Sequence, residues 1–406
     1  MTDGQIANID LVKQVNAAAV YRIIDLQGPI SRVKVAEISQ LAPASVTKIT
    51  RQLLEHDLIR EEALQESTGG RRAISLMTVR DRFQFVSCRL GRRTLYLALC
   101  DLAGRELVQM RRELVGQSTI DEVLATLIAT IDELISNNPR KIRKLIGLAV
   151  TLPGLVNPES GEVLYMPTLT LNKVPLAQLL ETHFALPCYV GNDTRSLALA
   201  EHFFGASQDT QDAILITIHN GVGSGIISKG RVLLGQNRNV GEIGHIQVER
   251  FGRRCHCGNF GCLETIVSNA AIVERSQELL ARGHASSLSS ASAPLTIEQI
   301  CRAANAGDAL ACQIIQETGE YLGRTIAIMV NLFNPEKILL AGEVVETDKI
   351  LFPAIRRCVK QQSLPSFHQN LPIERAYFQG QHTMGGVALI KRALLEGDLL
   401  QRIMEM

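Results

Sequence analysis

The sequence has no uninterrupted apolar run of membrane-spanning length, so we expect no transmembrane helix. It also lacks an excess of either charge. Lys and Arg number 42 and Asp and Glu 41, so any basic surface for nucleic acid must be local. The nine cysteines are an odd number without a leader peptide, which predicts a reducing, cytoplasmic environment. With 406 residues, 46% of them hydrophobic, we expect a globular chain of two or three domains.

A glycine-containing run at 241–264 concentrates cysteine, histidine and glutamate. Cys255 and Cys257 are one residue apart and Cys262 follows after four more, so turns at the intervening glycines can gather three thiolates. A tetrahedral zinc needs a fourth ligand, and we predict His245, which closes a strand-like run at hairpin distance. The sequence thus predicts one structural zinc per chain. Reduced cysteines without a metal are the alternative, and a nucleophilic role is disfavoured because no separate base is placed.

Three helices are expected before residue 57. The first covers residues 10–26 and ends at Gly28-Pro29; Ser31 caps a second helix through Ser39; a third runs from Ser45 to His56. Helix, short turn, helix is the pattern of a helix-turn-helix motif. The predicted apolar face of the first helix is Leu11, Val15, Ala18, Ala19, Ile23 and Leu26.

The third helix carries short donors and long cations near its first turns, where a recognition helix meets base edges and phosphates. The alternative is that this face is simply exposed to solvent on a small packing domain. Helical spacing alone favours neither the DNA-reading helix nor this alternative. The predicted DNA contacts of this motif are Arg32, Ser45, Thr47, Lys48 and Arg51.

Two short expected strands, at 58–62 and 73–77, flank a loop that carries the paired arginines Arg71 and Arg72. This arrangement is typical of a wing whose tip enters a narrow minor groove. The stretch 55–66 between the basic surfaces is acidic, which suits a DNA reader with defined contacts better than a general polyanion binder. The wing therefore favours the DNA-binding interpretation.

From residue 83 onward the pattern indicates an α/β protein, because strand hairpins are followed by alternating helices and strands. A Ser/Ala-rich excursion at 286–294 is expected to be flexible. Strands are expected at 83–90, 94–101, 106–114, 145–151, 188–191 and 337–340, and helices at 119–137, 194–204, 321–332 and 384–406.

Four motifs together resemble the ROK family of sugar kinases and sugar-responsive repressors. They are Gly241-Glu-Ile-Gly-His245, Cys255-His-Cys-Gly-Asn-Phe-Gly-Cys-Leu-Glu264, Leu152-Pro-Gly154 and Asn192-Asp193. With the amino-terminal helix-turn-helix, essentially the whole chain resembles the repressor branch.

The resemblance implies an α/β fold class: a winged helix-turn-helix followed by a two-lobed, actin-like domain with a zinc knuckle. The implied domains are 1–80 for DNA binding, 81–190 with 385–406 for the first lobe, and 191–384 for the second lobe. A sugar would bind in the cleft, with His245 holding zinc through one ring nitrogen and a sugar hydroxyl through the other. Asp193 could equally cap the helix expected at 194. The sugar-binding residues implied are Gly154, Asn192, Asp193, Glu242, His245 and Glu264.

Departures from the kinase pattern predict a protein that is not an enzyme. Family kinases begin their first lobe with Asp-x-Gly-Gly-Thr, whereas this chain has Arg89-Leu-Gly-Arg-Arg93. Arginines in place of the aspartate do not suit magnesium and phosphates. Two alternatives stay open: a sugar kinase that also binds DNA, which the retained Asp193 favours, and a repressor controlled by docking to a transport protein.

The resemblance further implies a repressor of amino-sugar uptake and catabolism genes, with N-acetylglucosamine 6-phosphate as inducer. Arg195 and His219 stand where family kinases carry other residues, and we predict that they hold the inducer phosphate. A salt bridge of Arg195 elsewhere on its helix is the alternative. The implied assembly is a homodimer or homotetramer on A/T-rich inverted repeats of double-stranded operator DNA.

Overall fold

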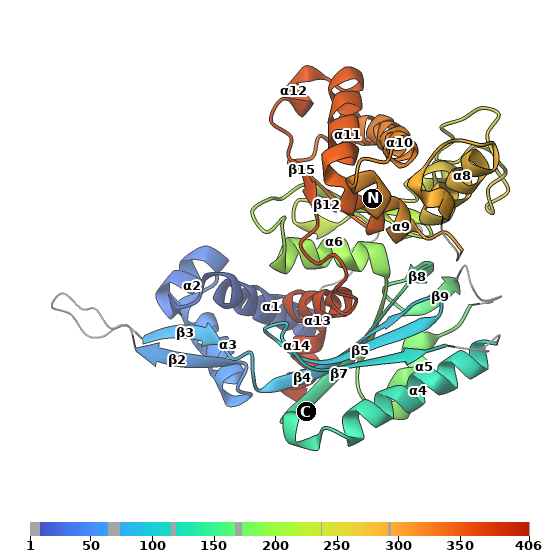
Figure 1. The fold of residues 1–406 in the computed structure, drawn as a ribbon. Helices are drawn as coiled ribbons and strands as arrows, with labels where there is room; N and C mark the ends of the chain where they lie inside the picture. The colour runs from blue at the N-terminus through green and yellow to red at the C-terminus, as the bar shows by residue number, and fades with distance from the viewer. Residues whose placement is uncertain are drawn as a thin grey trace. The chain divides into compact units, whose positions relative to one another are not determined.

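The structure, a computed structural model, describes residues 9–63, 74–114, 119–166, 173–236, 238–290 and 294–405. The chain forms two compact units (Figure 1). Unit 1 comprises residues 1–154, 158–191 and 386–406, and unit 2 comprises 155–157 and 192–385. The amino-terminal segment therefore belongs to the same unit as the last residues of the chain. The three-domain division predicted from the sequence stays a prediction.

The amino-terminal segment of unit 1 has three helices and a small antiparallel sheet in the order β1-β3-β2. Ser31 caps α2 as expected, because its side chain accepts from the backbone N–H of Lys34. Helix α3 begins two residues earlier than expected, since Pro43 occupies its first turn, where a missing N–H costs nothing. The elements are α1 (Ile9–Gln27), β1 (Ile30–Ser31), α2 (Arg32–Ser39), α3 (Pro43–Glu55), β2 (Ile59–Ala63) and β3 (Ile74–Thr78).

The buried face of α1 differs from the prediction. Tyr21 and Ile24 are buried, whereas Leu11, Val15 and Leu26 are 46%, 56% and 68% exposed. Helical spacing in this alanine-rich sequence allows more than one apolar stripe. Helices α2 and α3, strand β3 and the last helix, α14 (Asp398–Glu405), contact α1 and select the stripe that is buried.

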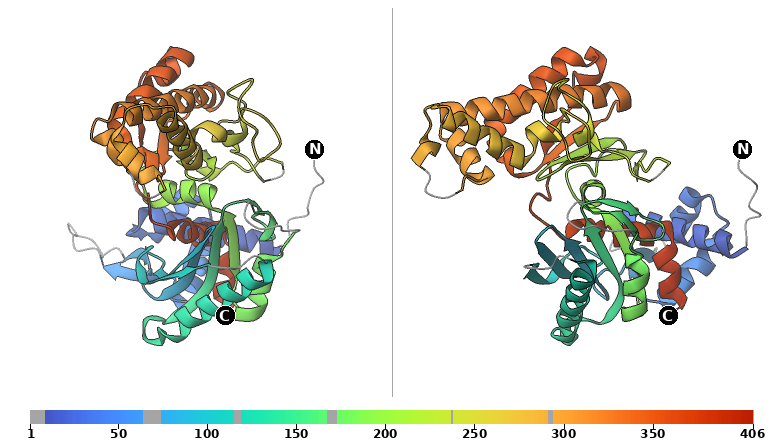
Figure 2. Two further views of the ribbon diagram at one scale, coloured as in Figure 1. Left: turned by 45° about the vertical axis from the view of Figure 1, so that its right-hand side comes forward. Right: turned by 90° about the vertical axis from the view of Figure 1, so that its right-hand side faces the viewer.

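A five-stranded sheet, in the order β10-β7-β4-β5-β6, forms the centre of unit 1. Strands β4 to β6 are antiparallel neighbours, while β7 runs parallel to β4. Helices α4 and α5 cover one face, where His183 lies 3.0 Å from Asp132, and α13 packs on the other face (Figures 1 and 2). The elements are β4 (Phe83–Leu90), β5 (Thr94–Asp101), β6 (Glu106–Glu113), α4 (Ile120–Ser136), β7 (Lys144–Leu152), β9 (Glu162–Tyr165), α5 (Leu176–Phe184) and β10 (Cys188–Asn192).

The carboxyl-terminal helix predicted at 384–406 is two helices. Gly397 has a φ of +96°, a left-handed conformation that suits glycine, and it separates α13 (Met384–Glu396) from α14 (Asp398–Glu405). The chain passes from unit 2 into unit 1 at Gly385–Gly386, within the first turn of α13.

Unit 2 contains a second five-stranded sheet, in the order β13-β12-β11-β14-β15. Both faces are covered, so alternate residues of β11 (Ala213–Ile218) enter different clusters: Ile214 and Ile216 pack toward α10, and Leu215 packs toward α6. The other strands are β8 (Leu155–Asn157), β12 (Val222–Ser228), β13 (Arg231–Val232), β14 (Lys337–Ala341) and β15 (Ile373–Arg375).

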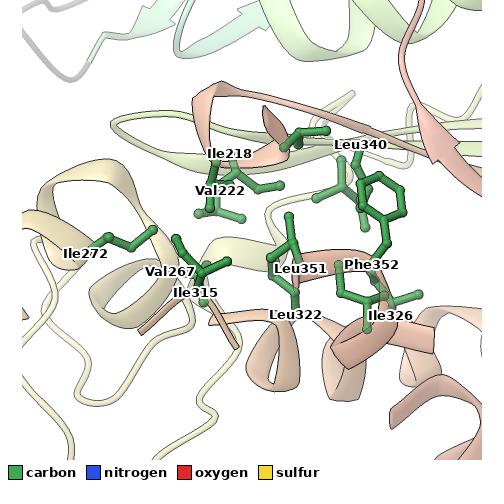
Figure 3. Packing of buried hydrophobic residues seen from close by; sticks show 14 of the residues in the cluster. Ile218, Val222, Val267, Ile272, Ile315, Leu322, Ile326, Leu340, Leu351 and Phe352 are labelled. Carbon is green, nitrogen blue, oxygen red and sulfur yellow. The ribbon is translucent and has the colours of Figure 1, made fainter. Parts of the chain in front are cut away.

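Two long helices supply a large part of the core of unit 2 (Figure 3). Leu322 and Ile326 of α10 meet Leu351 and Phe352 of α11 beneath the sheet. Helix α10 begins twelve residues before the predicted start because Asp308 caps it. The helices are α6 (Asp193–Phe204), α7 (Glu264–Val267), α8 (Asn269–Ala281), α9 (Ile297–Asn305), α10 (Ala309–Phe333), α11 (Asp348–Gln362) and α12 (Pro365–His368). In the described part of the chain, no helix is long and apolar enough to span a membrane.

Candidate functional site

Glycines shape the loop that carries the predicted metal ligands. The backbone N–H of Cys255 donates to Asn259 O at 2.7 Å, and Gly258 closes the turn with a φ of +95°. Gly261 has a φ of +63°, and a Cβ there would lie 1.8 Å from Glu249 O. Isolated bridges between residues 247 and 262 and between 254 and 260 return the loop as a hairpin. The turn glycines therefore bring ligands distant in sequence together, as predicted.

The four predicted ligands form one cluster. The ligand atoms of His245, Cys255, Cys257 and Cys262 all lie within 4.8 Å of one another. The Sγ atoms of Cys257 and Cys262 are 3.8 Å apart, and Cys255 Sγ is 3.6 Å from His245 Nδ1. Two thiolates on a tetrahedral zinc would be separated by about 3.8 Å. The cluster can therefore hold a metal ion.

The thiols of this cluster differ in environment. Burial, followed by hydrogen bonds from its cysteine neighbours, raises the pKa of Cys262 to about 12. The backbone N–H of Asn259 is the main cause that lowers the pKa of Cys257, which is exposed. A bound metal would take thiolates and release the protons.

His256 lies between two metal ligands in the sequence, a position from which we would expect it to point away from them, but the structure shows the opposite. Its ring centroid is 5.2 Å from that of His245, and its Nδ1 lies 3.1 Å from Glu264 Oε1. The ligand atoms of His245, His256 and Glu264 form a second group within 4.8 Å. Glu264 explains the orientation, because its carboxylate offers the exposed His256 a charged partner. No spacing pattern in the sequence predicts this contact.

The predicted sugar-binding residues divide between the two units. Gly154 belongs to unit 1, where its φ of +141° and the nearby Tyr165 O exclude a side chain. The other five are in unit 2. Asn192, rather than Asp193, caps α6, because its Oδ1 accepts from the backbone N–H of Arg195 at 3.0 Å. The alternative role of Asp193 as the helix cap is therefore wrong.

Glu264 connects the metal loop to the sheet of unit 2. Its Oε2 accepts from the backbone N–H of Val222 at 3.0 Å, while Oε1 faces His256. Glu242 is exposed and precedes the short helical turn that carries His245. Carboxylates held in this way keep acceptor capacity for hydroxyl groups.

Arg195 and His219 both have partners inside unit 2. Arg195 is 7% exposed and donates to Asn239 Oδ1 at 2.9 Å and to Val240 O at 3.4 Å. Its burial lowers its pKa, and the charges of Glu242 and Asp193 oppose that shift. These contacts support a structural role for Arg195, and a phosphate role stays a prediction.

His219 Nδ1 lies 2.7 Å from Glu343 Oε2, which also accepts from Asn269 Nδ2 at 2.7 Å. Burial would raise the pKa of Glu343, but the hydrogen bonds and the charge of these neighbours lower it to about 2. Glu343 and Asn269 were not predicted from the sequence, since they are 124 and 50 positions from His219 and share no motif with it.

The candidate DNA-binding face is the exposed side of α3. Ser45, Thr47, Lys48 and Arg51 are exposed, while Val46 on the opposite side is buried. Polar and apolar sides therefore lie as expected for a recognition helix. Arg71 and Arg72, at the predicted wing tip, lie outside the described residues.

Arg32 holds this segment together. Its Nε donates to Thr50 Oγ1 at 3.1 Å and its Nη2 to Glu61 Oε1 at 2.6 Å. The side chain thus links α2 to α3 and β2. Both contacts lie within the segment, so a role in positioning α3 accompanies any contact with DNA.

The stretch from Arg89 to Arg93 forms a tight hairpin between β4 and β5. The backbone N–H of Gly91 donates to Thr94 O at 2.9 Å, and that of Leu114 donates to Arg93 O at 2.7 Å. The hairpin contains no carboxylate that could hold magnesium.

Comparisons with known proteins agree with this arrangement. The model of the ROK family matches residues 85–393. The N-acetylglucosamine repressor of Escherichia coli O6:H1 is 52% identical over 413 residues, covering 100% of both chains. A crystal structure of a ROK family transcriptional regulator, a homolog of the E. coli MLC protein, has a TM-score of 0.92 and 45% identity, and covers 97% of this chain and 100% of that one.

A solved sugar kinase shares the fold. A ROK family glucokinase from Streptomyces griseus, solved with glucose and AMPPNP, has a TM-score of 0.64 at 23% identity. It covers 76% of this chain and 98% of its own. The full-length relatives described above are transcriptional regulators rather than kinases. An α/β fold with two mixed sheets, an amino-terminal helical segment and a Cys/His cluster suited to zinc places this chain in the ROK family.

Proposed function

We propose that this protein is a transcriptional repressor of amino-sugar uptake and catabolism genes that N-acetylglucosamine 6-phosphate releases from operator DNA. The observation that carries the proposal is full-length identity of 52% to an N-acetylglucosamine repressor, which includes the amino-terminal segment. The exposed polar side of α3 supports it. A repressor acts where DNA is, which for a bacterial protein is the cytoplasm.

DNA binding is assigned to α3 and the wing. Ser45, Thr47, Lys48 and Arg51 would meet base edges and phosphates in the major groove. Arg71 and Arg72 would add contacts in an A/T-rich minor groove. Recognition helices of two protomers would read inverted half-sites, so we infer a homodimer or homotetramer.

Zinc is the metal that the donor set favours. Three thiolates and one imidazole are typical of closed structural sites, and the 3.8 Å between Cys257 and Cys262 fits a tetrahedral ion. Bound zinc would fix the loop that ends at Glu264. His245 would then present its other ring nitrogen to a sugar hydroxyl.

The sugar is assigned to the polar groups that begin α6 and flank the metal loop. Asn192, Asp193, Glu242, His245 and Glu264 offer the donors and acceptors that ring hydroxyls need. Gly154 stays a prediction of the family resemblance. His219 and Arg195 remain our candidates for binding the phosphate. The His219 ring would then contact both Glu343 and the phosphate, and the Arg195 guanidinium both Asn239 and the phosphate.

A titration of operator DNA with and without sugars tests the proposal. We expect N-acetylglucosamine 6-phosphate to weaken operator binding about 5- to 150-fold, the usual range of allosteric coupling. Unphosphorylated N-acetylglucosamine should bind much more weakly and release less DNA, because it lacks the charge that a cationic site would bind. Calorimetry on the DNA-free protein gives both sugar affinities. Equal affinity for the two sugars would show that the pocket does not read the phosphate.

A kinase that also binds DNA is the second candidate, and the retained Asp193 is the residue that favours it. Incubation with ATP, magnesium and N-acetylglucosamine should yield no phosphosugar, because residues 89–93 provide no carboxylate for the metal. A ROK glucokinase assayed alongside is the positive control. Detection of phosphosugar above the protein-free background would restore the kinase assignment. Co-purification with a transport protein only in the presence of sugar would instead support docking control.

A further inference from the structure

A buried ion pair joins the DNA-binding segment to the last helices of the chain. The Lys391 ammonium donates to the Asp25 carboxylate, and the two side chains are only 10% and 3% exposed. Arg80 donates to the same carboxylate at 3.2 Å, and Thr78 Oγ1 donates at 3.4 Å. Asp25 lies on α1, Thr78 ends β3 and Lys391 lies on α13, so three elements meet at one carboxylate. Burial lowers the pKa of Lys391, and the charge of Asp25 opposes that shift.

Further contacts fix α1 along α13 and α14, which lie side by side with it (Figures 1 and 2). The Arg22 guanidinium donates to Leu395 O at 2.7 Å. A Cβ at Gly397 would lie 3.0 Å from Ala18 Cβ. The carboxyl-terminal helices therefore help to position α1 in unit 1.

Helix α13 is buried on its other side as well. A Cβ at Gly386 would lie 2.1 Å from Ser87 Oγ, and a Cβ at Gly147 would lie 3.7 Å from Ile390 Cδ1. The helix is thus packed between the central sheet and α1. Close-packed elements shift as bodies rather than deform, so a displacement of α13 reaches α1.

The segment that leads into α13 is held in unit 2 by a fully buried carboxylate. Glu201 Oε1 accepts from the backbone N–H of Phe378 at 2.7 Å, and its Oε2 accepts from that of Ala206 at 2.8 Å. Glu201 lies on α6, which begins at Asn192 and Asp193, the proposed sugar residues. A path therefore leads from the proposed sugar residues along α6 to Glu201, by a hydrogen bond to Phe378, and then along the chain itself into α13.

We propose that α13 carries the inducer signal to the DNA-binding segment and that the Lys391–Asp25 ion pair is the contact through which it acts. The inference rests on the proposed function, because the signal is sugar binding. Lys391 and Asp25 are positioning residues that act through α1. A carboxylate buried with its cations tolerates few arrangements, since loss of one partner leaves a buried charge uncompensated. A shift of α13 must then move α1 with it or break the pair.

The test compares operator affinity with and without N-acetylglucosamine 6-phosphate in wild type, Lys391→Met, Asp25→Asn and the double variant. Lys391→Met keeps an unbranched side chain and removes the charge. We expect the wild-type ratio of about 5- to 150-fold to fall to within about twofold of unity in Lys391→Met. Sugar-phosphate affinity of the DNA-free protein should change by less than about twofold, because the pocket is untouched. The double variant should lower the ratio no further than Asp25→Asn does, since each single substitution already removes the Lys391–Asp25 contact.

Asp101→Asn is the matched control. The Asp101 side chain is also 3% exposed in unit 1, and it pairs with Arg105 in the turn between β5 and β6. It should keep the wild-type ratio. If Lys391→Met does not fold, Lys391→Met with Asp25→Leu replaces the pair by apolar groups, a change that is often tolerated.

An undiminished ratio in a folded Lys391→Met or Lys391→Met/Asp25→Leu protein would overturn the inference and leave the proposed function standing. An equal loss of the ratio in Asp101→Asn would also overturn it, because general destabilisation of unit 1 would then suffice. A wild-type protein whose operator affinity ignores the sugar phosphate would overturn both proposals.

Discussion

Replacing Cys262 by alanine is expected to abolish metal binding and to disorder the loop that carries His245. Cys262 is fully buried, its Sγ lies 3.8 Å from that of Cys257, and the loop around it depends on turns rather than on an apolar core of its own. Removing one ligand from a structural zinc site forfeits the metal's contribution to folding. We expect zinc content to fall from one per chain to near zero, and stability to fall by about 4 kcal/mol or more.

Metal analysis of dialysed protein and thermal unfolding measure both effects. The matched control is Cys358→Ala, which removes a buried thiol of unit 2 that belongs to no metal cluster among the described residues. The free energy of unfolding of this variant should fall by about 1 kcal/mol, and its zinc content should not change. Sugar binding should weaken only in Cys262→Ala, because His245 and Glu264 flank the loop. A metal-free wild type that still binds sugar and DNA would rule out the structural zinc.

Replacing Lys48 and Arg51 together by alanine is expected to weaken operator binding by about 100-fold, or about 3 kcal/mol. Both side chains are exposed on α3, one helical turn apart, on the side opposite Val46 and Leu53. Such cations meet phosphates or base edges when the helix enters the major groove. Each lost phosphate contact should also reduce the slope of log affinity against log salt by about one.

Fluorescence anisotropy at several salt concentrations gives the affinity and the slope. Lys349→Ala with Lys360→Ala removes the same charge from exposed positions on α11 in unit 2 and should leave operator affinity within about twofold. Sugar-phosphate affinity should not change in either variant. If the α3 variant bound the operator as tightly as the control, α3 would be a packing helix rather than a reader.

The local patterns in this sequence were informative because they depend on neighbours along the chain. Ser31 caps α2 as its position predicts, and strands β4 and β5 have the predicted bounds, since alternation and hairpin turns are local signals. The metal cluster could be predicted from the sequence equally well. The glycine turns constrain Cys255, Cys257 and Cys262 strongly, and His245 completes the set of ligands. Family membership followed from the same motifs.

Contacts between distant segments had no such signal, and only the tertiary structure decided them. The apolar stripe of α1 was predicted only in part: Ala18 is buried, but Leu11, Val15 and Leu26 are exposed, because β3, α2, α3 and α14, rather than helical spacing, select which residues are buried. Gly397 divides the last helix because a left-handed residue lets α14 fold back onto α1.

The pairing of polar groups was likewise decided only by the tertiary structure. The partners of His219 and Asp25, Glu343 and Lys391, are 124 and 366 positions away, and burial in the folded chain determines that these charges must pair. The sequence therefore identified the residues of the metal cluster, and its assignments for sugar and DNA stay predictions. The fold decided which of their charges are already engaged, because a carboxylate or guanidinium removed from water takes the nearest partner that the packing provides.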